Sequence, residues 1–356
     1  MTAIIKREIK NYLKRPLFWI GVAVVILGVF QNVRPYLETR YVSSAEELEN
    51  DLPETVHKGD VYEGYIPTQE AERRTLWEKQ VEDTLRTGEG FELPDSEVDA
   101  VMAKIREVDV DEACLYLENE YHWFGAEYFW EDSAYRKGTP EEINAYLDRR
   151  LEEHPFSWYF ARKFADFAGL FMGFAATVLL AALFFQDMKK NTYELLHTKP
   201  VSAWKYVTGK VAGGFLVCVI ILGILNLVFW AAALIITRGN GFEIRLRDFL
   251  AATCLYILPN MLMIVCVYAL VSMVFKNPLP AVPLLVLYML YSNMGSRNAE
   301  GVYGYYGRPL AIMVRFPGML FDTVVPPMTM VNQCGLIMAS FVIILICVQL
   351  WRRRRI

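Results

Sequence analysis

The chain has 356 residues, of which 54% are hydrophobic, and its mean hydropathy is +0.23. That is too apolar for a soluble protein of this length. The net charge of −4 conceals an uneven distribution, because residues 34–161 carry 32 of the 40 acidic side chains. The composition therefore excludes a wholly soluble protein and predicts one acidic soluble region joined to a more basic, membrane-embedded remainder.

Residues 1–15 are predicted to form an amphipathic helix. One side carries lysines and arginines, and the other carries Ile5, Ile9, Tyr12, Leu13 and Pro16. Such a helix lies in the membrane interface rather than crossing the bilayer. A simple positively charged anchor for the following apolar segment is an alternative that the sequence leaves open.

Six apolar segments have the length, or nearly the length, of a transmembrane helix. A bilayer core about 30 Å thick needs roughly 20 apolar residues in a helix. The fifth segment is short and is interrupted by Pro280 and Pro283. We therefore predict an all-α integral membrane protein with transmembrane helices at 16–33, 164–186, 209–237, 249–275, 279–293 and 329–351.

The positions of lysine and arginine in the short loops predict the orientation. These residues gather in 1–15, in 187–208 and in the tail 352–356, whereas the other short loops carry fewer of them. Positive loops face the cytoplasm. We expect a multi-pass protein of the cell (plasma) membrane, with both termini in the cytoplasm and with residues 34–163 and 294–328 outside.

The outer region 34–163 is predicted to be a mostly helical extracellular domain. Thr139, Pro140 and Glu142 have the order of an N-cap, a first-turn proline and a capping-box glutamate. Ser43 and Glu46 have the spacing of a second helix start. Further along, apolar residues fall on one helical face at Val98, Val101, Met102 and Ile105.

Aromatic residues are dense in the middle of this region, in the stretch "YLENEYHWFGAEYFW" at 116–130. Large aromatic side chains dominate the cores of small domains, and they also grip ligands. We favour packing of a hydrophobic core over ligand binding for this stretch.

Residues 294–328 begin polar and glycine-rich and then become apolar, with several prolines. The apolar part is too short and too interrupted to cross a bilayer. Non-helical backbone survives at membrane depth only when it is buried in protein or lines a cavity. We expect a re-entrant or surface-packed hairpin of short helices on the outer side.

Polar side chains within the apolar segments are candidates for function. Asp166 lies near the outer end of the second segment, and Arg162 lies one helical turn earlier, so we expect these two residues to form a structural ion pair. Asn226 and Asn260 lie deeper in the third and fourth segments. We expect them to hydrogen-bond between helices, and lining a central cavity is the alternative.

A short polar link, "TYELLHTKPVSAWKYVTGK" at 192–210, joins the second and third segments. Pro200 bends the backbone and favours a new helix start, and Val201, Trp204 and Val207 recur at helical spacing. A partner that binds this link could move both flanking helices together. An interfacial turn anchored by lysines and Trp204 is the simpler alternative.

The stretch "YELLHTKPVSAWKYVTGK" resembles the loop between the second and third helices of ABC-2-type ABC transporter permeases. The order of the amphipathic first helix, the six spans and the re-entrant segment is similar over nearly the whole chain. The resemblance implies a transmembrane subunit of an exporter, in which this loop contacts an ATP-binding subunit. The contact residues would be Glu194, Leu195, Leu196, Lys199, Pro200 and Ser202. The outer domain is larger than in minimal exporters of the family, so no substrate is carried over from them.

The chain has no phosphate-binding loop of its own, because Trp204 stands where the first glycine before Gly209-Lys210 would be required. We therefore expect no catalytic residues and no cofactor in this chain. ATP and Mg would be bound by a separate ATP-binding subunit. Six spans correspond to half a transporter, which implies a second permease copy or a paralogue. The other predicted partners are membrane lipids, and nucleic acid is not among them.

Two other classes of function can be compared with the sequence. An intramembrane enzyme would need a catalytic set at membrane depth, but no span contains a histidine and no zinc-protease motif occurs. The scattered histidines and cysteines also predict no metal site. The remaining alternative is a membrane sensor, or an immunity or scaffold protein, whose extracellular domain binds a ligand and signals through a partner.

Overall fold

The computed structural model describes residues 2–44, 59–88, 91, 93–181, 201–297, 303–304 and 308–353. The chain forms two compact units. We call Met1–Glu38 together with His154–Ile356 the membrane unit, and Thr39–Glu153 the inserted unit. The inserted unit falls within the range 34–163 that the sequence predicts to be a separate domain.

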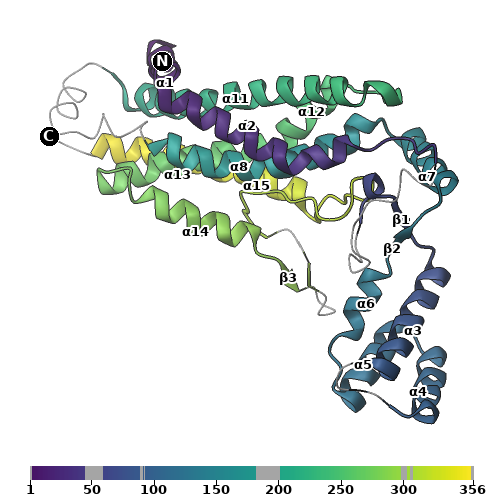
Figure 1. Ribbon diagram of the computed structural model, residues 1–356. Helices are drawn as coiled ribbons and strands as arrows, with labels where there is room; N and C mark the ends of the chain where they lie inside the picture. The colour runs from purple at the N-terminus through teal and green to yellow at the C-terminus, as the bar shows by residue number, and fades with distance from the viewer. Residues whose placement is uncertain are drawn as a thin grey trace. The chain divides into compact units, whose positions relative to one another are not determined.

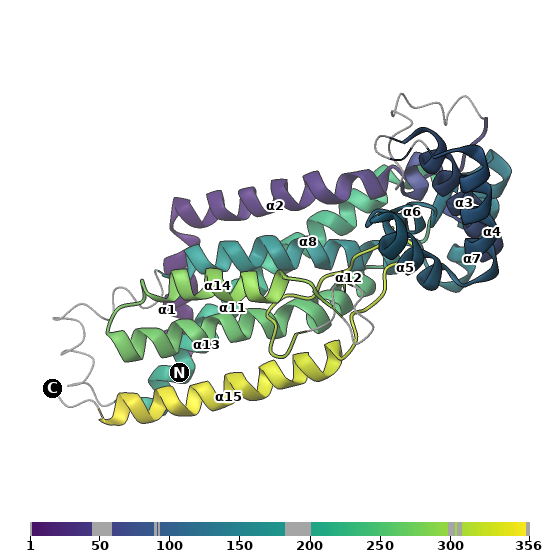
Figure 2. The ribbon, with the colours of Figure 1, turned by 90° about the horizontal axis from the view of Figure 1, so that it is seen from below.

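The membrane unit is a bundle of long helices that lie side by side (Figures 1 and 2). Its shorter elements are η3 (Arg238–Asn240), α12 (Leu246–Ala252), the π-helix η4 (Thr253–Ile257) and the strand pair β3 (Ser296–Arg297) and β4 (Tyr303–Gly304). The longer helices are α1 (Thr2–Leu13), α2 (Pro16–Leu37), α8 (Phe156–Leu179), α11 (Ala203–Ile236), α13 (Leu258–Phe275), α14 (Ala281–Asn293) and α15 (Thr329–Arg353).

Four helices among the described residues are long and apolar enough to cross a membrane. They are Pro16–Leu37, Ala203–Ile236, Leu246–Phe275 and Thr329–Arg353. Each overlaps a predicted span. The predicted spans 164–186 and 279–293 correspond to α8, which carries charged side chains in its first half, and to α14, which has only 13 residues. The chain is therefore a mostly helical, multi-pass membrane protein.

The third of these helices, Leu246–Phe275, contains a π turn instead of regular α-helix throughout. The backbone N–H of Leu258 donates to the carbonyl of Thr253, five residues earlier. Pro259 follows directly, and proline has no N–H and crowds the carbonyl one turn before it. The wider π turn accommodates this proline without ending the helix.

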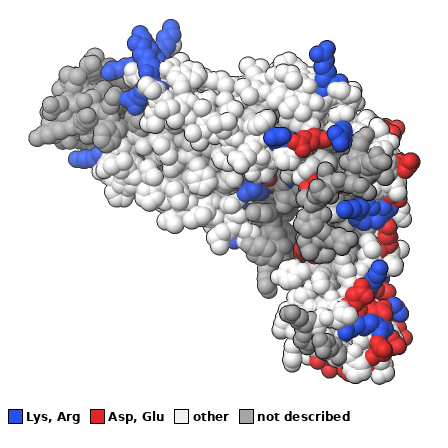
Figure 3. All heavy atoms as spheres, viewed as in Figure 1, with Lys and Arg blue, Asp and Glu red and all other residues white. Residues whose placement is uncertain are grey.

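The two ends of the bundle are distinguished by the elements that meet there. At one end, the hydroxyl of Tyr12 in α1 donates to the carbonyl of Leu179 in α8 (3.1 Å), and the rings of Tyr206 in α11 and Trp351 in α15 stack with centroids 4.1 Å apart. We call this the α1 end, and Figure 3 shows basic side chains gathered at α1. The opposite end, where α14 ends and α15 begins, we call the strap end.

Residues 308–328 form no helix, so the predicted hairpin of short helices is wrong for this part of the chain. We call this irregular segment the strap (Figure 2). Its four prolines prevent a continuous helix, and its buried side chains include Ile312, Phe316 and Phe321. Because the strap packs against protein, its backbone groups can be satisfied by side chains of neighbouring helices.

The inserted unit is mostly helical and also has a small two-stranded sheet that the sequence did not predict. Strands β1 (Tyr65–Pro67) and β2 (Tyr135–Lys137) pair antiparallel, with Ile66 opposite Arg136. The helical elements are η2 (Val61–Glu63), α3 (Glu70–Thr87), α4 (Asp95–Glu107), α5 (Val110–Tyr121), α6 (Ala126–Asp132) and α7 (Pro140–Glu153). Both signs of charge gather on the visible face of this unit (Figure 3).

The core of the inserted unit combines one buried tryptophan with aliphatic side chains. The indole N–H of Trp77 donates to the carbonyl of Ala126 (2.9 Å). The predicted apolar face of α4 is confirmed, because Val98, Val101, Met102 and Ile105 are all buried. In the aromatic stretch, Trp123, Phe129 and Trp130 pack against this core, while Phe124 and Tyr128 are exposed. Most of the aromatic side chains in this stretch therefore contribute to the packing of the core.

The predicted capping box at the start of α7 is confirmed. The backbone N–H of Thr139 donates to Glu142 Oε2 (2.9 Å), and the backbone N–H of Glu142 lies 3.3 Å from Thr139 Oγ1. Arg136 also donates to both oxygens of Glu142. The other predicted start depends on Glu46, which lies outside the described residues.

These hydrogen bonds make α7 sensitive to acid. Donation from Arg136, followed by the backbone of Thr139, lowers the pKa of Glu142 to about 2, from about 4.3 in an unfolded chain. A carboxyl whose folded pKa is depressed stabilises the fold fully above the unfolded pKa and loses that effect as pH falls toward the folded pKa. We expect α7 to lose protection from hydrogen–deuterium exchange as the pH falls from about 4.3 toward about 2 in the wild type, and less so in Glu142→Gln. Glu141→Gln, at an exposed neighbour, should behave like the wild type. Equal pH dependence in all three chains would contradict the assignment.

Candidate functional site

The residues predicted to contact an ATP-binding subunit end where α11 begins, at Ala203. Ser202 is the N-cap of α11, and its Oγ lies 3.4 Å from the backbone N–H of Lys205. This satisfies one of the free N–H groups of the first turn and sets the helix start. The other predicted contact residues lie outside the described residues: Glu194, Leu195, Leu196, Lys199 and Pro200.

The first turns of α11 pack directly against α1. A Cβ atom at Gly209 would lie 3.3 Å from Ile4, and one at Gly213 would lie 3.1 Å from the Cβ of Glu8. Two glycines four residues apart form a flat strip on one face of a helix and allow two helix backbones to approach closely. The amphipathic helix is therefore fixed to the start of α11.

A buried ion pair lies at this contact. Lys210 Nζ is 2.8 Å from Glu8 Oε1, and the two residues are 4% and 7% exposed. Burying two charges is costly unless they neutralise each other in good geometry. The buried side of α1 contains Glu8 and Tyr12, whereas Leu13 and Pro16, which the sequence places on the apolar side, are exposed. The face of α1 was assigned from apolar residues alone, and α11 supplies the cation that allows Glu8 to be buried.

A second group of buried charges lies at the strap end. Asp166 in α8 forms an ion pair with Arg315 of the strap, whose guanidinium also donates to Asn293. The predicted pair with Arg162 is wrong. Arg162 instead donates to the carbonyl of Thr323 (2.8 Å), and its guanidinium lies 3.5 Å from the ring of Trp158. The spacing of one turn places Arg162 on the same helical face as Asp166, but Asp166 pairs with Arg315 of the strap.

Lys163 holds the strap through its backbone. Its ammonium group donates to the carbonyls of Phe316 (3.0 Å) and Gly318, and the residue is 4% exposed. Two carbonyls that a helix would have satisfied internally are thus satisfied by one cation of α8. Arg162, Lys163 and Asp166 together fasten the strap to α8.

The two predicted amides have different environments. Asn226 in α11 makes an interhelical hydrogen bond with Thr253 of the π turn, with Nδ2 2.9 Å and Oδ1 3.1 Å from Oγ1. Asn260 in α13 donates to the carbonyl of Tyr256 in its own helix (2.6 Å). Its buried Oδ1 has no hydrogen-bond partner within the described ranges. Neither residue lines the pocket described next.

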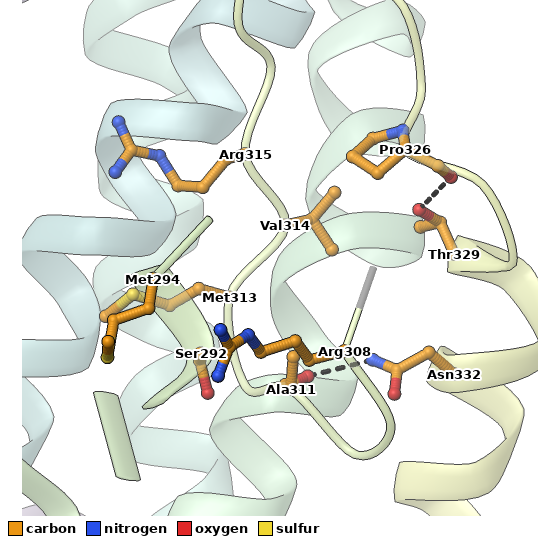
Figure 4. A pocket seen from close by; sticks show the side chains of 10 residues that line it. All are labelled: Ser292, Met294, Arg308, Ala311, Met313, Val314, Arg315, Pro326, Thr329 and Asn332. Carbon is orange, nitrogen blue, oxygen red and sulfur yellow. Dashed lines mark hydrogen bonds between the residues drawn. The ribbon is translucent and has the colours of Figure 1, made fainter. Parts of the chain in front are cut away.

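A small pocket of about 30 Å³ lies between the strap and the neighbouring helix ends (Figure 4). Drug-sized ligands occupy pockets of roughly 300 to 1,000 Å³. This pocket therefore has no room for a whole amphiphilic cargo and can hold only a small polar group. Arg308 extends toward Ser292 and Met294, whereas Arg315 points toward α8 (Figure 4). Asn332 donates to the carbonyl of Ala311 (2.9 Å) on one side of the pocket.

Several charged residues that organise these sites were not identified from the sequence. Glu8 is the only acidic side chain in a strongly basic helix, which was a usable signal. Lys163 and Arg315 carry no comparable local signal. Their partners are about 150 residues away in the chain, at Phe316 (153) and Asp166 (149), so no local spacing could show the pairing.

Residues 2–349 match the family described as "ABC-2 family transporter protein". No curated protein and no solved structure gives a significant match to the chain. The match covers α1, the inserted unit, the strap and the described helices long enough to span a membrane, ending at residue 349 within α15. The chain therefore belongs to the ABC-2 family of transporter proteins and is a transmembrane, permease-type component of an ABC transporter rather than its ATPase.

Proposed function

We propose that the chain is the permease subunit of an ABC-type exporter that moves a peptide, an antibiotic or another amphiphile out of the cell. A separate subunit binds ATP and Mg and drives alternating access between the two sides of the membrane. In this proposal α8 and α14 complete a set of six spans, the α1 end faces the cytoplasm, and a second permease copy or a paralogue completes the pathway.

The observation that carries the proposal is the way α11 begins. The predicted contact residues 194–202 end at the Ser202 N-cap, and within about three turns α11 is joined to α1 by the glycine strip and the Glu8–Lys210 ion pair. A force applied to the link would therefore move α1 and α11 as one body.

The length of α11 supports transmission across the bilayer. Its 34 residues correspond to roughly 50 Å at about 1.5 Å per residue, which is more than the thickness of the hydrocarbon core. The same helix carries Asn226, which is hydrogen-bonded to the π turn of the neighbouring helix. A displacement at the α1 end would therefore reach the middle of the bundle through a rigid element.

Replacing Glu194 and Pro200 together by alanine tests the coupling. We expect the variant to bind the ATP-binding subunit about tenfold more weakly, which corresponds to the loss of about 1.4 kcal/mol at a contact centre. Stimulation of ATP hydrolysis by the permease should fall in parallel. Co-purification and the ATPase activity of the reconstituted complex measure the two effects.

The matched control is Arg238→Ala, at an exposed residue after the end of α11. We expect this variant to keep both association and stimulation. If Glu194→Ala with Pro200→Ala leaves association and stimulated hydrolysis unchanged, the link is not the coupling element. Labelling of the link from outside the cell would contradict the proposed orientation.

A further inference from the structure

We propose that the pocket at the strap end binds the phosphate group of an anionic membrane lipid, with Arg308 as its main ligand. The inference does not depend on coupling to an ATPase, because it concerns binding of lipid to this chain alone. It requires a cation that the protein has not neutralised, a cavity matched to a headgroup, and an apolar surface for the lipid chains.

The guanidinium of Arg308 carries a positive charge that no ion pair among the described residues neutralises. One of its N–H groups donates to the carbonyl of Gly295 (2.8 Å), and its guanidinium lies 5.2 Å from the ring of Tyr291. Its Nε is buried and has no hydrogen-bond partner in the described part of the chain. No described carboxylate forms an ion pair with it, whereas Arg315 is paired with Asp166. A buried donor of this kind calls for an acceptor.

The pocket lining suits an anion. Among the described residues that line it are Arg308 and Arg315 and no acidic residue, and the polar side chains of Ser292, Thr329 and Asn332 also line it. A guanidinium presents its donors in a planar fork that matches the oxygens of a phosphate. The volume of about 30 Å³ leaves room for part of a headgroup and not for acyl chains.

The surface beside the pocket suits acyl chains. Large apolar side chains are exposed at the neighbouring ends of the strap, α14 and α15, in a chain that crosses the membrane. Their exposed fractions are 58% for Met294, 42% for Leu310, 67% for Met328, 46% for Met330 and 61% for Val331. An amphiphile can therefore place its phosphate at Arg308 and its chains along this surface. A free phosphate ion would use only the first of these features.

The test uses the full chain purified in detergent and native mass spectrometry to measure lipid affinity. Soluble short-chain phosphatidylglycerol is the anionic probe, and phosphatidylcholine with the same chains is the zwitterionic one. We expect the wild type to prefer phosphatidylglycerol. Arg308→Gln should weaken its binding by about tenfold or more, as expected for the loss of a charge-assisted hydrogen bond. Arg238→Gln, at the exposed arginine after α11, should leave affinity unchanged.

Equal losses in Arg308→Gln and Arg238→Gln would overturn the proposal in favour of general charge attraction, and so would no loss in either. Millimolar inorganic phosphate should not displace the lipid. If phosphate binds as tightly as the lipid, the lipid assignment is overturned and the site is one for small anions. Should Arg308→Gln fail to fold, Arg308→Lys keeps the charge without the fork. It is expected to lose at least about threefold in affinity, and wild-type affinity in this variant would also overturn the proposal.

Discussion

Replacing Lys210 by methionine is expected to destabilise the protein by about 3 kcal/mol, because it leaves the carboxylate of Glu8 buried between α1 and α11 without its cation. Methionine keeps the length of the lysine stem, so the glycine contacts with α1 can persist. Reversible unfolding in mixed micelles with increasing SDS measures the change. The permease-dependent stimulation of ATP hydrolysis should fall as well, since α1 would be held to α11 by the glycine contacts alone.

Two further variants separate the ion pair from general effects of the substitution. Lys205→Met removes an exposed lysine one turn earlier and is expected to change stability little. The double variant Glu8→Leu with Lys210→Met replaces both charges by apolar groups, and it should recover most of the lost stability. If Lys210→Met costs no more than Lys205→Met, the pair does not hold α1 to α11.

The second large effect is expected at the strap end. Arg315→Met should destabilise the protein by about 3 kcal/mol, because Asp166 is 4% exposed and loses the cation that neutralises it. Asn293 loses a hydrogen-bond partner in the same variant. The strap should also become more accessible, so limited proteolysis at 308–328 and SDS-induced unfolding are the appropriate measurements.

Arg162→Met is the matched comparison, because Arg162 is the partner that the sequence predicts for Asp166. It loses one hydrogen bond to a carbonyl and its contact with Trp158, so its expected cost is about 1 kcal/mol. A cost in Arg162→Met as large as that in Arg315→Met would show that the one-turn spacing had identified the working ion pair after all.

The comparison of Arg162 with Arg315 shows which contacts a local sequence pattern can predict. A spacing of four residues shows which side chains share a helical face. It gives no information about a segment nearly 150 residues further on that packs against the same face. The strap itself was misread for a related reason. Its apolar residues suggested short helices, but residues 308–328 form none, and Lys163 donates hydrogen bonds to two carbonyls that a helix would have satisfied internally.

Features that depend on composition and on neighbours along the chain could be predicted from the sequence. Long apolar runs specify spanning helices because the bilayer requires about 20 apolar residues with internally bonded backbone. The capping box at Thr139 and the apolar face of α4 follow from the geometry of one helix. The order of these elements, together with the link at 192–210, was enough to indicate the ABC-2 family.

Which charges are buried together could be learned only from the packing of the folded chain. Glu8 and Lys210 are 202 residues apart, and Asp166 and Arg315 are 149 apart. The helical periodicity of the segments that carry these four side chains does not distinguish them from charged side chains that face solvent. Burial of a charge is tolerated only when packing brings an opposite charge to it, and packing depends on the arrangement of all the helices. The pocket beside Arg308 arises in the same way, from the strap and the ends of two helices.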